Sequence, residues 1–175
     1  MSGTEWVQGP LSLGADQGRT CLSERTVLVV VHHLTAATRL VDVLPLLESD
    51  RRVQLVFTLA PSSMFSAGAC GFLDRLGGVV VPWQQATAVS CDLAVAASRG
   101  LLKQLHAPVL TLPHGVSFNK FLARWRGPGP DGPREVAGLE PTRLVYRGRV
   151  IPSAIVVPTR ADLGRTTARD RSRPG

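Results

Sequence analysis

Three histidines and a serine are the side chains best placed to do chemistry, because each follows a short apolar run rich in β-branched residues: His32, His33, Ser98 and His114. Such runs predict buried strands, so these side chains are expected where strands end. An imidazole titrates near neutral pH and can take a proton from a hydroxyl group. We therefore predict His114 and His33 as catalytic bases, and His32 and Ser98 as ligand-binding residues.

The turn at His114 adds three candidate ligand-binding residues, each with a plainer alternative. Gly115 would let a ligand approach the backbone, or it serves only the turn. Asn119 and Lys120 would hold an anionic group, or they are solvated residues at the start of a helix. The same caution applies to the adjacent histidines, one of which is expected to be a hydrogen-bonded structural group.

Several motifs that would indicate other chemistry are missing. No GxGxxG follows the first apolar run, and the chain has no GxxxxGK[ST], GxSxG or HExxH, so the dinucleotide, P-loop, hydrolase and zinc-protease classes lose their usual support. The three cysteines, Cys21, Cys70 and Cys91, form no CxxC pair. We accordingly predict no cofactor, no metal site and no disulfide framework, which fits a reduced cytoplasmic location.

Five β-rich runs organise the chain between residues 25 and 158. Segments of helical or connecting character separate them, as expected for a mostly parallel sheet flanked by helices. The runs are Val27–Val31 with order beginning at Arg25, Val53–Leu59, Val79–Trp83, Leu93–Ala97 and Val109–Leu112. The predicted fold class is α/β, a single Rossmann-like domain. In a parallel sheet the carboxyl ends of the first, fourth and fifth strands would bring the candidate residues to one edge.

The helices are predicted from apolar spacing and capping residues. Thr35 is expected to cap a helix whose apolar stripe runs from Ala37 to Leu47, with a kink at Pro45. A second helix is expected over residues 64–76, and a polar link over Gln84 and Gln85. Ser98 is expected to cap one more helix, which carries three leucines: Leu101, Leu102 and Leu105.

The C-terminal third is less regular. Residues 126–141 are rich in glycine and proline and predict a loop. A hairpin is expected over residues 144–151 and a sixth strand over Ala154–Pro158. We predict that residues 1–24 form a disordered leader and residues 159–175 a disordered, arginine-rich tail.

The positive charge is concentrated in that C-terminal part. The net charge is +7, yet residues 1–122 hold nine basic against eight acidic side chains, whereas residues 123–175 hold eleven against five. This distribution suggests a rival function, a binding protein that contacts RNA, the ribosome or another polyanion through residues 124–173. The early apolar run Val27–Val31 is far shorter than the roughly 20 residues of a membrane span, so no span is predicted.

The order of these segments resembles the amino-terminal half of GT-B-type glycosyltransferases. In particular, it resembles actinobacterial proteins related to CDP-glycerol glycerophosphotransferases and the UDP-GlcNAc 2-epimerase-like group. The segments that carry the likeness are VVVHHLTAATRLVDVLPLL, VQLVFT, PW, DLAVAAS and APVLTLPHGVSFNK. The most specific of them is LPHGVSFNK, which is similar to a His-Gly turn that these enzymes use near the acceptor.

The resemblance implies a function that this chain would share with a second domain. In proteins of this fold the first domain holds the acceptor and the second binds the donor nucleotide. The chain would thus be the acceptor-side half of a glycosyl- or glycerophosphotransferase, truncated and inactive alone, with a polyol, sugar or cell-envelope polymer precursor as acceptor. A third possible function is that of a structural or regulatory partner. The exposed edge of its sheet would then pair with a second copy of this chain or with another protein.

Overall fold

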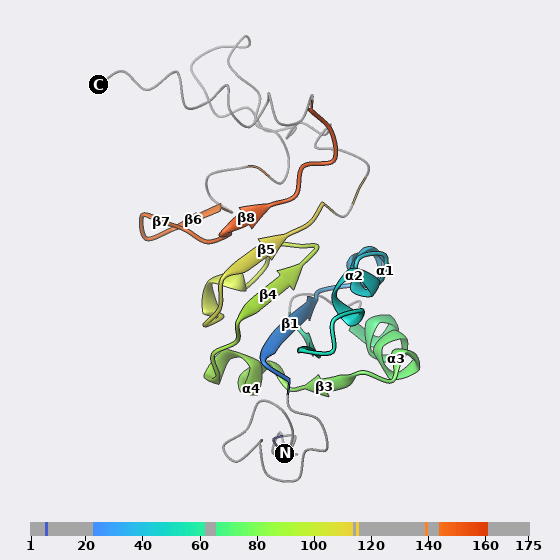
Figure 1. The fold of residues 1–175 in the computed structure, drawn as a ribbon. Helices are drawn as coiled ribbons and strands as arrows, with labels where there is room; N and C mark the ends of the chain where they lie inside the picture. The colour runs from blue at the N-terminus through green and yellow to red at the C-terminus, as the bar shows by residue number, and fades with distance from the viewer. Residues whose placement is uncertain are drawn as a thin grey trace, which may run out of the picture.

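The strand Arg25–Val31 (β1) lies in the middle of a six-stranded sheet in which all strands are parallel (Figure 1). The computed structural model describes residues 23–61, 66–113 and 144–160, together with Trp6, Gly115 and Leu139. The strand order is β3-β2-β1-β4-β5-β8. The other strands are β2 (Val53–Leu59), β3 (Val79–Val81), β4 (Leu93–Ala96), β5 (Val109–Thr111) and β8 (Ala154–Ile155). The sequence-based prediction of one Rossmann-like α/β domain is confirmed.

β1 is central because its side chains are apolar on both faces. Val27 to Val31 are all at most 4% exposed, and β1 pairs with β2 on one side and with β4 on the other. A strand that is covered on both faces has a continuous run of apolar residues rather than an alternating pattern, and β1 has such a run. Burial of these valines and of Leu28 therefore holds the two halves of the sheet together.

Helices cover the two faces of the sheet. α1 (Leu34–Val41), α2 (Leu44–Glu48) and α3 (Ser66–Leu76) cover one face, where Leu40, Leu44 and Leu73 pack with the alternate valines of β1. α4 (Trp83–Ala88) and the 3₁₀ helix η1 (Leu102–Gln104) cover the other, where Trp83 and Leu102 pack with Leu28 and Val30. These two cores bury both sides of the parallel sheet.

Two details of the first helical segment differ from the prediction. His33, not Thr35, is the N-cap of α1, because its Nδ1 accepts the backbone N–H of Ala36 and the helix already begins at Leu34. The apolar stripe is also not one kinked helix. α1 ends at Val41, and Pro45 lies in the first turn of the separate helix α2, where its missing N–H costs no hydrogen bond.

Two further local predictions are wrong. Gln84 and Gln85 are not a polar link but part of α4, which forms because Trp83 and Ala86 have apolar surface to bury against the sheet. Ser98 caps no α-helix. The chain turns through Leu101, whose φ of 63° is left-handed, and forms only the three-residue η1.

At the C-terminal side the hairpin is confirmed, and the sixth strand is present but covers only Ala154–Ile155 (β8) of the predicted Ala154–Pro158. β6 (Val145–Tyr146) and β7 (Arg149–Val150) pair antiparallel around Arg147 and Gly148, which both have positive φ. β8 pairs parallel with β5. The predicted leader, the loop 126–141 and the tail fall almost entirely outside the described residues and stay predictions. In the part of the chain that is described, no helix has the length and apolarity to cross a membrane.

Candidate functional site

The strand order creates a reversal point between β1 and β4. From β1 the chain builds outward to β2 and β3, then returns to the other side of β1 to form β4 and β5 (Figure 1). In open α/β sheets, ligands bind outside the carboxyl ends of the strands at such a point. His32 and Ser98 follow strands paired in register, Val30 with Ala96, so the structure brings them to the same edge. This is the edge predicted from the sequence.

His32 occupies this reversal point but is buried. Its side chain is 2% exposed, and its Nε2 lies 2.6 Å from the carbonyl oxygen of Gly100, in the connection after β4. A carbonyl can only accept, so Nε2 carries the proton and Nδ1 keeps the lone pair. Nδ1 is buried and makes no hydrogen bond to a described residue. Burial lowers the pKa of His32, and the hydrogen bond to Gly100 opposes that shift only in part.

His33 has a capping role in the structure. Its Nδ1 accepts a hydrogen bond of 3.2 Å from the backbone N–H of Ala36, in the first turn of α1. Because Nδ1 is the acceptor, the neutral ring carries its proton on Nε2. A base must offer a lone pair to its substrate, and here the cap uses that of Nδ1. The predicted catalytic role of His33 would therefore require the cap to break, and it stays a prediction.

The remaining predicted residues are described only in part. Ser98 is half-buried after β4, and Gly115 is exposed after β5, the neighbouring strand. A Cβ added at Gly115 would meet nothing within 4 Å, so the described residues do not crowd this position. His114, Asn119 and Lys120 lie outside the described residues, and their predicted roles are untouched.

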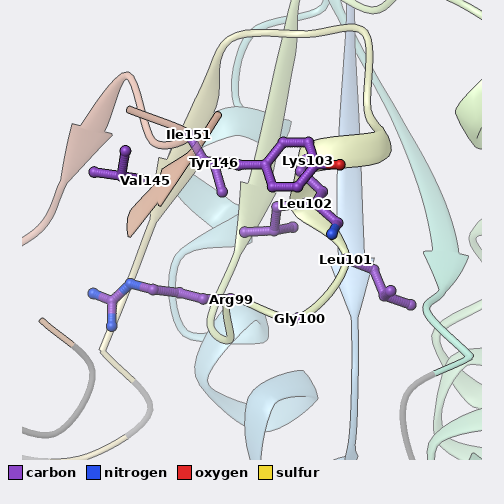
Figure 2. Close-up of a pocket in the computed structure, with 8 residues that line it drawn as sticks. All are labelled: Arg99, Gly100, Leu101, Leu102, Lys103, Val145, Tyr146 and Ile151. Carbon is purple, nitrogen blue, oxygen red and sulfur yellow. The ribbon is translucent and has the colours of Figure 1, made fainter. Parts of the chain in front are cut away.

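A pocket that the sequence-based prediction missed lies beside this edge. It has a volume of about 240 Å³ and separates the connection after β4 from the β6–β7 hairpin (Figure 2). Its lining residues are Arg99, Gly100, Leu101, Leu102, Lys103, Val145, Tyr146 and Ile151. The hairpin itself was predictable, but nothing in the local sequence indicated that its tyrosine would pack against residues forty positions earlier.

Gly100 connects the pocket with the sheet edge. It lines the pocket, and its carbonyl oxygen is held by His32. At the last residue of η1, Oε1 of Gln104 accepts a hydrogen bond of 3.1 Å from the indole Nε1 of Trp83. The connection after β4 is thus tied to the sheet at its start and to α4 near its end.

The described residues contain no group of three or more His, Cys, Asp or Glu side chains that could hold a metal ion. Burial raises the pKa of the Cys91 thiol, with the nearby Asp92 adding to the shift, so this thiol is a weaker nucleophile than a free cysteine. Asp92 itself lies before β4, at the opposite end of the strand from the candidate edge.

Comparison with protein-family models, with curated proteins and with solved structures finds no match for this chain.

Proposed function

We propose that this domain binds a hydroxyl-bearing acceptor, a polyol or a sugar, as the acceptor-side half of a GT-B-like glycosyl- or glycerophosphotransferase. The observation that carries the proposal is the reversal of strand order between β1 and β4 in an all-parallel sheet. Ligands of such sheets occupy the crevice at this point. The resemblance of the segments around His33 and His114 to acceptor-side domains supports the class of ligand.

Ser98, at this edge, suits a hydroxyl-bearing ligand. The hydroxyl of Ser98 can both donate and accept, which matches the hydroxyl groups of a polyol or sugar. His32 is a positioning residue, because its bond to Gly100 holds the backbone that follows Ser98. The proton acceptor in the transfer step is assigned to His114, which follows β5, next to β4 in the sheet. A donor nucleotide would be bound elsewhere.

An NMR titration tests the acceptor site directly. Glycerol and N-acetylglucosamine are added at millimolar concentration to ¹⁵N-labelled chain, and backbone amide shifts are followed. We expect shifts at Ser98, Gly100 and Gly115, on the carboxyl edge. Ser98→Ala should weaken binding about fivefold, the loss of one hydrogen bond.

Ser90→Ala is the matched control, because Ser90 is an exposed serine that precedes β4 at the opposite edge of the sheet. It should leave binding unchanged. Shifts confined to the amino edge, or equal affinities in the Ser98→Ala variant and the parent chain, would overturn the proposal.

The rival polyanion function rests on basic residues that mostly lie outside the described chain, and it remains a prediction.

A further inference from the structure

The pocket between η1 and the β6–β7 hairpin has a strongly one-sided charge. The charged side chains among its lining residues, Arg99 and Lys103, are both basic, and none of the described residues that line it is acidic. Arg147, at the tip of the hairpin, adds a third cation beside the pocket-lining Tyr146. A concave site lined by charges of one sign attracts ligands of the opposite sign.

Tyr146 contacts two of these cations through its ring. Nζ of Lys103 lies 4.1 Å from the centroid of the Tyr146 ring, and the guanidinium carbon of Arg147 lies 5.4 Å from it. Both are within the range in which an aromatic ring attracts a cation. The ring attracts each cation but carries no net negative charge, so it leaves both positive charges without a counter-charge.

Neither cation is committed to a described carboxylate. Among the described residues, Arg25 pairs with Asp92, Arg39 with Asp42 and Arg52 with Asp50, and none of these side chains lines the pocket. Lys103 and Arg147 interact with the Tyr146 ring instead. Figure 2 shows Arg99 extending away from that ring, so its stem lines the pocket while its guanidinium lies to one side.

The rest of the lining is apolar and firmly held. Val145, Tyr146 and Ile151 supply accessible carbon surface beside Lys103, whereas Leu102, which is 2% exposed, belongs to the buried core. The wall formed by residues 99–103 is fixed by the bond between His32 and Gly100, although it includes the left-handed backbone of Leu101. The hairpin wall is closed by the bond of 2.8 Å from the N–H of Ile151 to the carbonyl oxygen of Leu144. Both walls are therefore in place before a ligand arrives.

We propose that this pocket binds a small phosphate monoester. Its phosphate oxygens accept hydrogen bonds from Lys103, and its carbon body contacts Tyr146 and Ile151, which line the pocket with Lys103. The volume of about 240 Å³ lies below the roughly 300–1,000 Å³ typical of pockets for drug-sized ligands, which favours a ligand with a short body. This site shares Gly100 with the acceptor edge but uses other side chains, and it would hold a charged ligand.

Isothermal titration calorimetry at low salt tests the proposal with four probes: inorganic phosphate, glycerol 3-phosphate, phenyl phosphate and octathymidylate. Phenol and glycerol are the uncharged controls. We expect the two monoesters to bind and the uncharged compounds not to bind. Lys103→Gln keeps most of the side-chain stem and removes the charge, and should weaken monoester binding about tenfold, the loss of a charge-assisted hydrogen bond.

Arg149→Gln is the matched control, because Arg149 is an exposed arginine on the same hairpin that does not line the pocket. It should change monoester affinity less than about twofold. Because Lys103 is exposed, its replacement should not disturb folding, and thermal melts of each variant check this. Ser98→Ala should also leave monoester binding unchanged, so failure of this proposal and failure of the acceptor site can be told apart.

The probes separate the remaining outcomes. Inorganic phosphate bound as tightly as the monoesters would support phosphate recognition and assign the site to the free ion. Octathymidylate bound more tightly than any monoester, with equal losses in Lys103→Gln and Arg149→Gln, would overturn the proposal in favour of a diffuse polyanion surface. The proposal would also be overturned if the monoesters do not bind, or if their affinity is the same in Lys103→Gln as in the parent chain.

Discussion

Nε2 of His32 donates a hydrogen bond of 2.6 Å to the carbonyl oxygen of Gly100, across the point where the sheet reverses its strand order. One residue follows β1 and the other follows β4, so the bond joins the two connections that border the candidate acceptor edge. Gly100 also lines the phosphate pocket. A single buried imidazole thus holds backbone that belongs to both proposed sites, and its replacement should affect both.

Replacement of His32 should destabilise the protein. His32→Ala removes a buried ring and leaves the Gly100 carbonyl without its partner, so the free energy of unfolding should fall by about 2–4 kcal/mol. Urea unfolding followed by circular dichroism measures the change. His106→Ala is the control, because His106 is exposed, and it should change stability by less than about 0.5 kcal/mol. A His32 variant as stable as the parent would show that the bond contributes nothing.

The same histidine should make stability depend on pH. The pKa of His32 is lowered in the folded state, mainly by burial, so between that value and the ordinary value of 6.5 the unfolded chain binds more protons. Stability should therefore be full above pH 6.5 and fall as the pH decreases through the range below it. Urea midpoints measured from pH 7.5 to 5 should decline in the parent chain and decline less in His32→Leu.

Protonation of Asp50 should affect stability in a separate, lower pH range. The pKa of Asp50 is lowered to about 2, mainly by the hydrogen bonds from the Arg52 side chain and backbone. Asp50 therefore loses its contribution only as the pH falls from about 4 toward 2. A decline between pH 7.5 and 5 that is identical in the parent chain and in His32→Leu would contradict the assignment to His32.

Gly78 should tolerate no side chain. A Cβ built there would come within 2.4 Å of the Phe57 ring, which is 5% exposed in the core under α3. Gly78→Ala should cost about 1–3 kcal/mol, the usual effect of overpacking. Gly71→Ala, inside α3, would meet only the tip of Arg75 at 3.9 Å and should stabilise by up to about 1 kcal/mol. Thermal unfolding of the two variants should show shifts of opposite sign.

Gly148 should control the hairpin wall of the phosphate pocket. Its φ of 78° follows the φ of 49° at Arg147, and an alanine in the left-handed region costs about 1–2 kcal/mol. In Gly148→Ala, hydrogen exchange at the Ile151 amide, which bonds to Leu144, should become faster. The variant should also bind phenyl phosphate more weakly. Unchanged exchange at Ile151 would mean that the turn does not control the wall.

The β-branched runs determined most of the fold. Strands such as Val27–Val31 are buried on both faces and need crossover connections, and these two requirements together predict the parallel sheet and its shared carboxyl edge. The same reasoning predicted that His32 and Ser98 would reach one edge, which the register of β1 with β4 confirms. Local patterns were sufficient here because each strand is specified by its own few residues.

Only the tertiary structure decided what those side chains do. Burial of His32 and its bond to Gly100 depend on how the connection after β4 folds back, and the spacing of residues does not determine that path. The helix over Gln84 and Gln85 forms because Trp83 finds apolar surface on the sheet. The phosphate pocket unites Lys103 with Tyr146, which are far apart in sequence, because the hairpin packs against η1. Such long-range contacts depend on packing of the whole chain, and no short segment encodes them.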